Sequence, residues 1–396
     1  MKYYIKKAVV FLGLLIALFF IVDMPVFAKD VIVIIDPGHG GENLGAQWNG
    51  RQEKDITLVV AKAMKQELQK YEGITVYMTR EDDADLTLQE RADFAEKKNA
   101  DFLYSLHFNM SEYHTLYGTE IWVSAFGEGY SKGYAFGEIY LDKMTGLDLY
   151  NRGIKTRLNK KGTDYYGIIR TCTEYEIPSC ILEHCFLDRP EDEGRHETEE
   201  KLQELGRLDA TAVAQYFKLS SKELGVDYSD YQVSEIPVPT DVMKPDLTPP
   251  ENCQVEILSV DEENAELTFS LTAKDSDSGM LYYAYSIDGG LNYSELNMWN
   301  GDDTIEATIS IPYGKQMKLV CKALNGYDIE SVTETLSVNA IFEPEELMLV
   351  KKGEEKPINN LTLVICIVGL SLLISMFFVL ILSKTMTKKK RKKRRK

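Results

Sequence analysis

Two histidines stand where the chain leaves apolar, strand-like segments. His39 lies in IIDPGHGG, directly after the run VIVII (31–35), and His107 lies in LYSLHFN, at the end of a second apolar stretch. Ligand-binding residues of open α/β sheets gather at the carboxyl ends of strands, and glycines such as those beside His39 allow a backbone to approach a ligand closely. Each histidine alone fits a structural role equally well, as a hydrogen-bonded polar residue at a strand end.

Two glutamates strengthen the interpretation as a catalytic metal site. Glu53 begins the segment EKDITLVV, at the predicted start of a helix, where its carboxylate also complements the helix dipole. Glu183 lies at the end of the apolar segment SCILEHCF, and a carboxylate there must be hydrated, paired or linked to a metal, because an unpaired buried charge is costly. Two histidines and one glutamate with an open fourth position form a catalytic zinc set. A second glutamate then serves as the general base on the water that zinc activates.

Four segments, in this order, resemble the zinc-dependent N-acetylmuramoyl-L-alanine amidases of the third type. They are IIDPGHGGENLGA, QEKDITL, VYMTREDDADLTLQERADFAEKKNADFLYSLHFN and IPSCILEHCFLDRPED, within residues 31–218. The resemblance implies a mixed sheet flanked by helices and hydrolysis of the amide between N-acetylmuramic acid and L-alanine of peptidoglycan. It also implies Zn²⁺ held by His39, Glu53 and His107, with Glu183 as the catalytic base.

The chain departs from this family at two places beside the expected site. After the catalytic glutamate the family usually has E-x-G-F-L-S-N-P, whereas this chain has EHCFLDRP. The family's SIHAN is SLHFN here, so Phe108 adds bulk beside the metal. Because all four chemical residues remain, these differences bear on substrate preference more than on activity. We interpret three histidines as non-catalytic, namely His114, His196 and His184, the last of which should face away from Glu183 because side chains alternate along a strand.

Alternating strand and helix patterns must position these residues. Thr87 and Glu90 form a capping box at the start of the helix LQERADFAEKK. Further helices are predicted at 56–71, 131–144 and 196–219, and strands at 31–35, 74–79, 101–108, 118–126, 165–170 and 179–186. This alternation predicts one α/β domain with a partly parallel sheet.

The segments beyond this domain have a different character. Residues 251–342 contain short alternating runs separated by Gly, Asn and Asp, typical of a small all-β sandwich of the Ig-like or fibronectin-like kind. Cys253 and Cys321 flank this region, and the sequence leaves their pairing open, as it does any binding of wall glycan by the sandwich. The predicted order is a signal peptide at 1–28, a catalytic domain at 29–222, a linker at 223–250, the sandwich at 251–342, a stalk at 343–360, a transmembrane helix at 361–383 and a basic cytoplasmic tail at 384–396.

The two ends predict a membrane-anchored protein. The first residues combine lysines, the apolar run 8–22 and the small-residue site Val26-Phe27-Ala28, a pattern of a secretory signal cleaved after Ala28; an uncleaved anchor is the alternative. The uncharged run 361–383 is long enough to cross a bilayer. The basic cluster that follows it places the C-terminus in the cytoplasm. We therefore expect a single-pass cell-membrane protein with an extracellular catalytic domain.

The net charge of the chain limits the classes of partner that it can bind. The formal net charge is −17 although the chain ends in KKKRKKRRK, so the body is strongly acidic, which argues against binding to nucleic acid. The expected partners are peptidoglycan and the membrane, and nothing in the sequence names a protein partner. Two other functions stay open: a catalytically inactive, membrane-tethered wall-binding scaffold, and a zinc hydrolase of another peptide amide. The biological process and the preferred stem peptide are not readable from the sequence.

Overall fold

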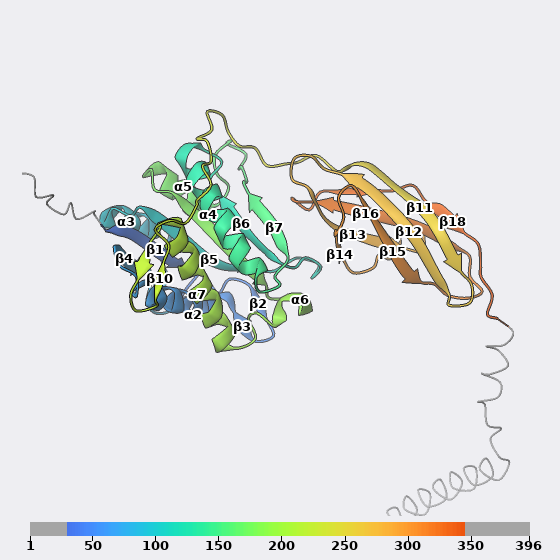
Figure 1. Ribbon diagram of the computed structural model, residues 1–396, viewed down its shortest axis with the longest axis horizontal. Helices are drawn as coiled ribbons and strands as arrows, with labels where there is room; N and C mark the ends of the chain where they lie inside the picture. Colours follow the sequence, from blue (N-terminus) through green and yellow to red (C-terminus); the bar gives the residue numbers. More distant parts are fainter. Residues whose placement is uncertain (1–29, 345–396) are drawn as a thin grey trace, which may run out of the picture. The chain divides into compact units, whose positions relative to one another are not determined.

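The computed structural model describes residues 30–344 (Figure 1). The predicted signal peptide and the predicted C-terminal helix lie outside the described residues. Among the helices that are described, none is long and apolar enough to cross a membrane. The described chain forms two compact units: the first contains residues up to Val255 with Leu271–Ile305 and Val320–Thr335, and the second contains Glu256–Ser270, Glu306–Leu319 and the residues from Leu336 on.

A six-stranded mixed sheet in the order β4-β1-β5-β8-β6-β7 organises the first part of the chain. The first four strands in that order are parallel, β6 runs antiparallel to β8, and β7 runs parallel to β6. The predicted mixed sheet is therefore confirmed. The strands are β1 (Val31–Pro37), β4 (Ile74–Met78), β5 (Phe102–Asn109), β6 (Thr119–Val123), β7 (Asn151–Lys155) and β8 (Ser179–Phe186).

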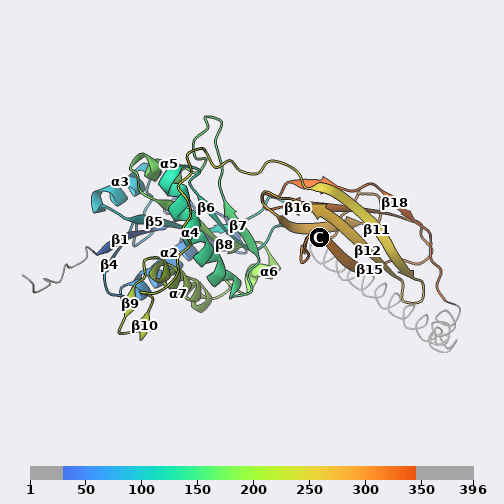
Figure 2. The same cartoon turned by 45° about the horizontal axis from the view of Figure 1, so that its top comes forward.

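Helices cover both faces of this sheet. Val33 and Ile35 of β1 pack in one apolar core with residues of α2 (Glu53–Leu68), α4 (Gly127–Thr145) and α7 (Glu199–Tyr216). Ile34, which points to the opposite face, packs with residues of α3 (Leu88–Lys98) and α5 (Gly167–Glu174). Both views show α4 and α7 side by side (Figures 1 and 2). Burial on both faces explains why residues 31–35 of β1 are all apolar.

All four predicted helices are present, with ends that differ from the prediction by up to four residues, and one predicted strand is wrong. Thr87 and Glu90 form the predicted capping box at the start of α3. The prediction of a strand at 165–170 is wrong. This segment leads into α5, and the buried residues Ile168, Ile169 and Cys172 share one face of that helix. A short helix, α6 (Pro190–Glu193), and two small hairpins complete this part; the hairpins are β2 (Gln47–Trp48) with β3 (Arg51–Gln52), and β9 (Ser220–Ser221) with β10 (Val226–Asp227).

From Glu251 onward the described chain contains strands and no helix. One sheet has the order β11-β12-β15, and a second has the order β14-β13-β16-β17 with β18 also paired to β16. The predicted change to a β-rich region is confirmed, and Cys253 and Cys321 are free thiols within it. The strands are β11 (Glu251–Asp261), β12 (Glu266–Lys274), β13 (Met280–Ser286), β14 (Asn297–Met298), β15 (Thr304–Ser310), β16 (Met317–Asn325), β17 (Glu330–Val332) and β18 (Leu336–Val338).

Candidate metal centre

His39, Glu53 and His107 converge at the carboxyl ends of β1 and β5. One possible ligand atom from each lies within 4.8 Å of the others. Oε2 of Glu53 is 3.0 Å from Nε2 of His39, and its Oε1 is 2.9 Å from Nδ1 of His107. Two imidazoles and one carboxylate are a donor set that suits Zn²⁺ and related divalent transition metals. The three residues therefore fit a metal ion by type and by position.

The loop that carries His39 has a backbone that few residues tolerate. His39 itself adopts the left-handed region, with φ of 61°, which is uncommon outside glycine. A Cβ atom on Gly38 would lie 2.4 Å from Cε1 of His107. A Cβ atom on Gly45, whose φ is +67°, would lie 2.4 Å from Oε2 of Glu53. Glycine at these two positions leaves room for the ligand side chains to meet.

Two buried arginines hold this loop by its carbonyl oxygens. Nη2 of Arg91 donates to the carbonyl of His39 at 2.7 Å, and Nη1 donates to that of Pro37 at 2.8 Å. Nη2 of Arg80 donates to the carbonyl of Gly38 at 2.8 Å, and its Nε donates to that of Pro37 at 3.0 Å. The strained conformation at His39 is thus fixed by contacts to the backbone at His39 and at the two residues before it.

Asp36 links this support to His107. Its Oδ1 accepts from Nη1 of Arg91 at 2.7 Å and from the hydroxyl of Thr79 at 2.6 Å. Its Oδ2 accepts from the hydroxyl of Ser105 at 2.7 Å, and that hydroxyl oxygen lies 3.2 Å from Nε2 of His107. Groups outside a metal's ligand shell commonly orient the ligands in this way.

Glu53 is the buried anion of the centre. Its carboxylate accepts hydrogen bonds from the backbone N–H of Ala46 at 2.7 Å and of Phe108 at 3.0 Å. Burial alone would raise the pKa of Glu53, but the hydrogen bonds and charges of His107 and His39 hold that pKa well below its usual range. Burial alone would lower the pKa of His39, but the contact with Glu53 raises it. The carboxylate therefore stays ionised between two imidazoles.

Glu183 lies beside this cluster on the neighbouring strand. Its Cα pairs with that of His107 in the register of β5 and β8, and with that of Glu120 in the register of β6 and β8. Within the described part of the chain, its buried Oε2 atom has no hydrogen-bond partner. Burial, together with the negative charges of Glu53 and Glu120, raises the pKa of Glu183 well above its usual value. An unpartnered carboxyl oxygen with a raised proton affinity suits general acid–base chemistry.

A second charged cluster that the sequence did not indicate borders Glu183. Oε2 of the buried Glu120 is 2.9 Å from Nε of Arg152 and 2.7 Å from Nζ of Lys155. Oε1 of Glu120 accepts from Nδ2 of Asn109 at 2.9 Å. Burial would raise the pKa of Glu120, but Lys155 and Arg152 lower it to about 2. The only sequence signal for this cluster is the presence of charges within the strand segments TEIWV and NRGIK.

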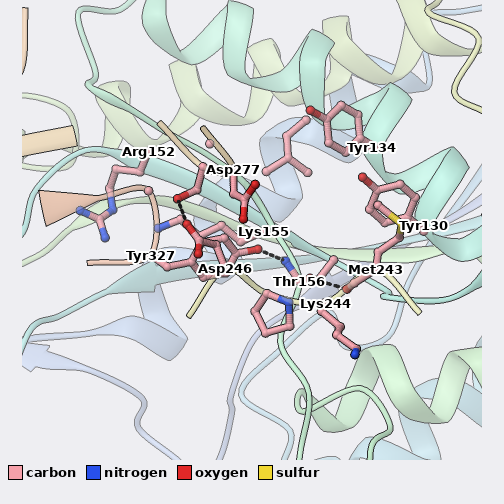
Figure 3. Close-up of a pocket in the computed structure, with 15 residues that line it drawn as sticks. Tyr130, Tyr134, Arg152, Lys155, Thr156, Met243, Lys244, Asp246, Asp277 and Tyr327 are labelled. Atoms are coloured by element: carbon pink, nitrogen blue, oxygen red, sulfur yellow. Dashed lines mark hydrogen bonds between the residues drawn. The ribbon is translucent and has the colours of Figure 1, made fainter. Parts of the chain in front are cut away.

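Arg152 and Lys155 also border a separate cavity. It measures about 430 Å³, belongs to the first compact unit and includes Arg152, Lys155 and Tyr134 in its wall (Figure 3). Both cations have carboxylate partners, because Glu120 pairs with both and Asp328 lies 2.7 Å from Nη2 of Arg152. The residues described around this cavity include none of the predicted site residues, so it is distinct from the metal centre.

The remaining histidines have partners in the fold. Nε2 of the fully buried His184 lies 2.9 Å from Oδ2 of Asp209 on α7, and its Nδ1 lies 3.0 Å from the carbonyl oxygen of His107. His184 therefore lies on the α7 side of β8 and fixes the backbone of a metal-ligand candidate. The other two pair as His114 with Asp188 and His196 with Arg51.

Several known proteins are similar in sequence to the part of the chain that carries these residues. A solved structure, the catalytic domain of CwlV, an N-acetylmuramoyl-L-alanine amidase from Bacillus (Paenibacillus) polymyxa var. colistinus, is 26% identical with a TM-score of 0.41, covering 48% of this chain and 99% of that one. The sporulation-specific N-acetylmuramoyl-L-alanine amidase of Bacillus subtilis is 32% identical over 201 residues, which are 48% of this chain and 69% of that protein. The uncharacterized protein YqiI of the same bacterium is 32% identical over 185 residues, 47% of this chain and 84% of that protein. Residues 33–215 match the Amidase_3 family. By these sequence matches, the chain belongs to the Amidase_3 family of N-acetylmuramoyl-L-alanine amidases.

Proposed function

We propose that this chain is a zinc-dependent hydrolase that cleaves the amide between N-acetylmuramic acid and L-alanine in peptidoglycan. The observation that carries the proposal is the convergence of His39, Glu53 and His107 opposite a carboxyl group, Glu183, that has an unpartnered oxygen. Membership in the amidase family supports the choice of bond. The acidic body of the chain is compatible with a wall substrate and unfavourable for nucleic acid.

His39, Glu53 and His107 would hold the zinc ion. Zn²⁺ at such a site supplies a Lewis acid that acidifies water and polarises the amide carbonyl. The chain orients its donors through neighbours, since Nδ1 of His39 lies 2.9 Å from Oδ1 of Asn43, which fixes the ring. Replacing either histidine by alanine should remove metal and activity together. Full zinc occupancy in both variants, measured by atomic absorption, would contradict this ligand assignment.

Glu183 moves the proton in the proposed reaction. Its carboxylate accepts a proton from the attacking water and delivers it to the leaving nitrogen of alanine. The raised pKa of Glu183 favours holding the proton between these two events. Glu53, whose pKa is lowered, remains ionised at the same pH and so serves as a ligand. Two neighbouring carboxyl groups thus take different roles because their surroundings differ.

The replacement Glu183→Gln tests this role. It keeps the shape of the side chain and the three zinc ligands, so zinc content and thermal melting should stay near those of the wild type. Release of new alanine amino termini from purified walls should fall by about 10²- to 10⁴-fold, the usual contribution of a positioned acid–base group. Glu96→Gln, an exposed position on α3, is the matched control. Activity within a few-fold of wild type in a folded, zinc-loaded Glu183→Gln protein would overturn the assignment.

We further infer an anchored architecture around this enzyme. The proposal is a catalytic domain at 29–222, a linker at 223–250 and a β-sandwich at 251–342. It is supported by the sheets, since none of them pairs a strand of 29–222 with a strand of 251–342, and by the alternating burial of β12. The uncharged run 361–383 and its basic flank support a single-pass anchor with the enzyme outside the cell. Protease added to intact, wall-stripped cells should remove the catalytic domain and spare the tail; protection of the catalytic domain would refute this topology.

A further inference from the structure

The cavity shown in Figure 3 is bordered by segments that are far apart in the sequence. They are α4, the end of β7, residues 243–246, residues 277–278 and residues 326–327, all within the first compact unit. The volume of about 430 Å³ falls within the range of small-molecule sites in proteins. The cavity is therefore large enough to bind a ligand, and the chemistry of its wall indicates which kind.

Direct hydrogen bonds join the segments that form this wall. The N–H of Met243 donates to the carbonyl of Ala125, just before α4, at 2.9 Å. The hydroxyl of Thr156 donates to the carbonyl of Met243 at 2.8 Å, and the N–H of Thr156 donates to the hydroxyl oxygen of Tyr327 at 2.9 Å. The segments are thus held together by the chain itself, which limits the entropy lost when a ligand binds.

Two tyrosines of α4 give the cavity an aromatic side. Tyr130 and Tyr134 lie one helical turn apart, and the centres of their half-buried rings are 5.5 Å apart. Figure 3 shows both rings on one side of the cavity, with Asp246 and Asp277 on the other. Among the residues that the structure describes, neither phenol hydroxyl has a hydrogen-bond partner. A tyrosine combines an apolar ring face with a polar tip, so this side suits a ligand that has both kinds of surface.

The cations of the wall do not make the cavity basic. The two buried cations, Arg152 and Lys155, share Glu120 as an ion-pair partner. The third cation, Lys244, is exposed, and the wall also contains two aspartates. The wall therefore has no surplus of positive charge that would attract an anion. An uncharged polar ligand complements this balance of charges better than an anionic one.

Asp277 supplies a hydrogen-bond acceptor that the fold does not use. Its side chain is exposed and, within residues 30–344, forms neither a hydrogen bond nor an ion pair. The two oxygens of the buried Asp246, by contrast, already accept bonds from the hydroxyls of Ser278 and Thr248. A ligand with hydroxyl groups can therefore donate to Asp277 and exchange hydrogen bonds with the two free phenols.

The cavity is separate from the metal centre. Lys155 pairs with Trp122 in the register of β6 and β7, and Trp122 pairs with Ile181 in the register of β6 and β8. The end of β7 therefore lies toward the start of β8, whereas Glu183 and the metal-ligand candidates lie at the carboxyl ends of β8, β5 and β1. A ligand in the cavity is thus not at the bond that is cut, and the cavity is a binding site and not a second catalytic one.

We propose that this cavity binds N-acetylated hexosamine units of the glycan strand of peptidoglycan. The inference rests on the proposed function for the identity of the polymer. In the uncut polymer these sugar rings are uncharged, carry hydroxyl and amide groups at their edges and present C–H groups on their faces, which matches the two tyrosines and Asp277. Because a glycan strand is a long polymer, one strand can occupy the cavity while the amide lies at the metal centre.

The double variant Tyr130→Ala/Tyr134→Ala, made in the full zinc-loaded chain, tests the aromatic side. Kd for the tetramer of β-1,4-linked N-acetylglucosamine, measured by titration calorimetry, should rise about 5- to 150-fold, the range for losing two aromatic contacts. Tyr165→Ala/Tyr175→Ala removes two rings that do not border the cavity and should keep the wild-type Kd. Equal Kd values in wild type and the Tyr130/Tyr134 variant would overturn the proposal, as would a wild type that does not bind the tetramer.

A second variant guards against loss of the fold, since Tyr130 also packs against the core of the first domain. Asp277→Ala removes an exposed carboxylate that has no partner among the described residues, so the melting temperature should not change. Kd for the tetramer should rise about two- to tenfold, the range for one hydrogen bond. Asp302→Ala, at another exposed position of the same unit, is the matched control. The proposal is also overturned if folded Asp277→Ala binds the tetramer as tightly as wild type.

The tetramer contains no amide to alanine, so the failure of this proposal can be told apart from the failure of the enzymatic one. A chain that binds the tetramer through Tyr130 and Tyr134 but releases no alanine termini from walls would refute the enzymatic function and leave the cavity standing. A chain that releases alanine termini but does not bind the tetramer would refute only the cavity.

Discussion

Replacing Arg91 tests whether the metal centre depends on its backbone support. In the wild type, Arg91 donates to Asp36, to Pro37 and to the carbonyl of His39. The variant Arg91→Met removes these three bonds, together with the bond from Nε of Arg91 to the carbonyl of Leu86, and leaves the Asp36 carboxylate buried with only hydroxyl partners. Arg91→Lys keeps the positive charge and can still pair with Asp36, but a single ammonium cannot reproduce the fork that also holds His39.

The expected magnitudes follow from which groups lose their partners. Pro37 keeps a hydrogen bond from Arg80, so its carbonyl remains satisfied. The carbonyl of His39 loses its bond from Arg91, which costs about 1–3 kcal/mol in Arg91→Lys. Breaking the buried pair as well brings the cost to about 3–5 kcal/mol in Arg91→Met. Because Asp36→Asn removes the stranded charge, the double variant Asp36→Asn/Arg91→Met should lose less than the sum of the single variants.

Urea unfolding with chelator present measures these costs without the contribution of zinc binding. A competition titration against a zinc chelator then measures metal affinity, which should fall about 10- to 100-fold in both Arg91 variants if the carbonyl of His39 is what Arg91 positions. The reasoning is refuted if folded Arg91→Lys binds zinc as tightly as wild type. It is also refuted if Arg91→Met unfolds within about 1 kcal/mol of wild type.

Two further outcomes are expected. Gly38→Ala should lose most zinc, because its Cβ would lie 2.4 Å from the His107 ring. Gly194→Ala, which has open space around it, is the control and should keep zinc. Equal metal contents in the two variants would show that the close approach of Gly38 to His107 is not needed. Burial raises the pKa of Asp192 to about 6. The contribution of the protonated side chain to stability is therefore complete below the pKa that Asp192 has in the unfolded chain, and it is lost as the pH rises through 6. Asp192→Asn keeps an acceptor for two backbone amides. It should stabilise the chain by up to about 3 kcal/mol at pH 7 and little at pH 4. The prediction is contradicted if the urea midpoints of the variant and the wild type differ by the same amount at both pH values.

The sequence predicted those elements whose side-chain pattern matches their burial. The run VIVII is apolar because β1 is covered on both faces, and α3 begins where its capping box predicts. The positions of His39 and His107 after apolar runs, with the family's order of segments, predicted that they and Glu53 would meet. The predictions for β1 and α3 needed only local pattern, whereas the grouping of His39, Glu53 and His107 also needed the resemblance to the family.

Other features depend on tertiary contacts that no local pattern contains. The strand β7 has the sequence NRGIK, which looks solvent-exposed, yet Arg152 and Lys155 are buried because Glu120 on another strand neutralises them. The segment YYGIIR is short and apolar, and such runs do not distinguish a strand from a buried helix. It was assigned to a strand, whereas Ile168 and Ile169 lie in α5. The neighbouring positions of Glu120 and Glu183 follow from strand order, which the sequence alone did not specify.

The arginine support of the His39 loop has a consequence for metal uptake. Arg80 and Arg91 hold the loop through carbonyl oxygens, and neither residue is a metal-ligand candidate. Small zinc domains fold only when the metal arrives, so uptake and folding are one event. Here the chain's own arginines support the loop, so we expect the apoprotein to be folded before a metal ion binds. If zinc is the metal, we then expect it to be removed by a chelator and restored without unfolding of the chain.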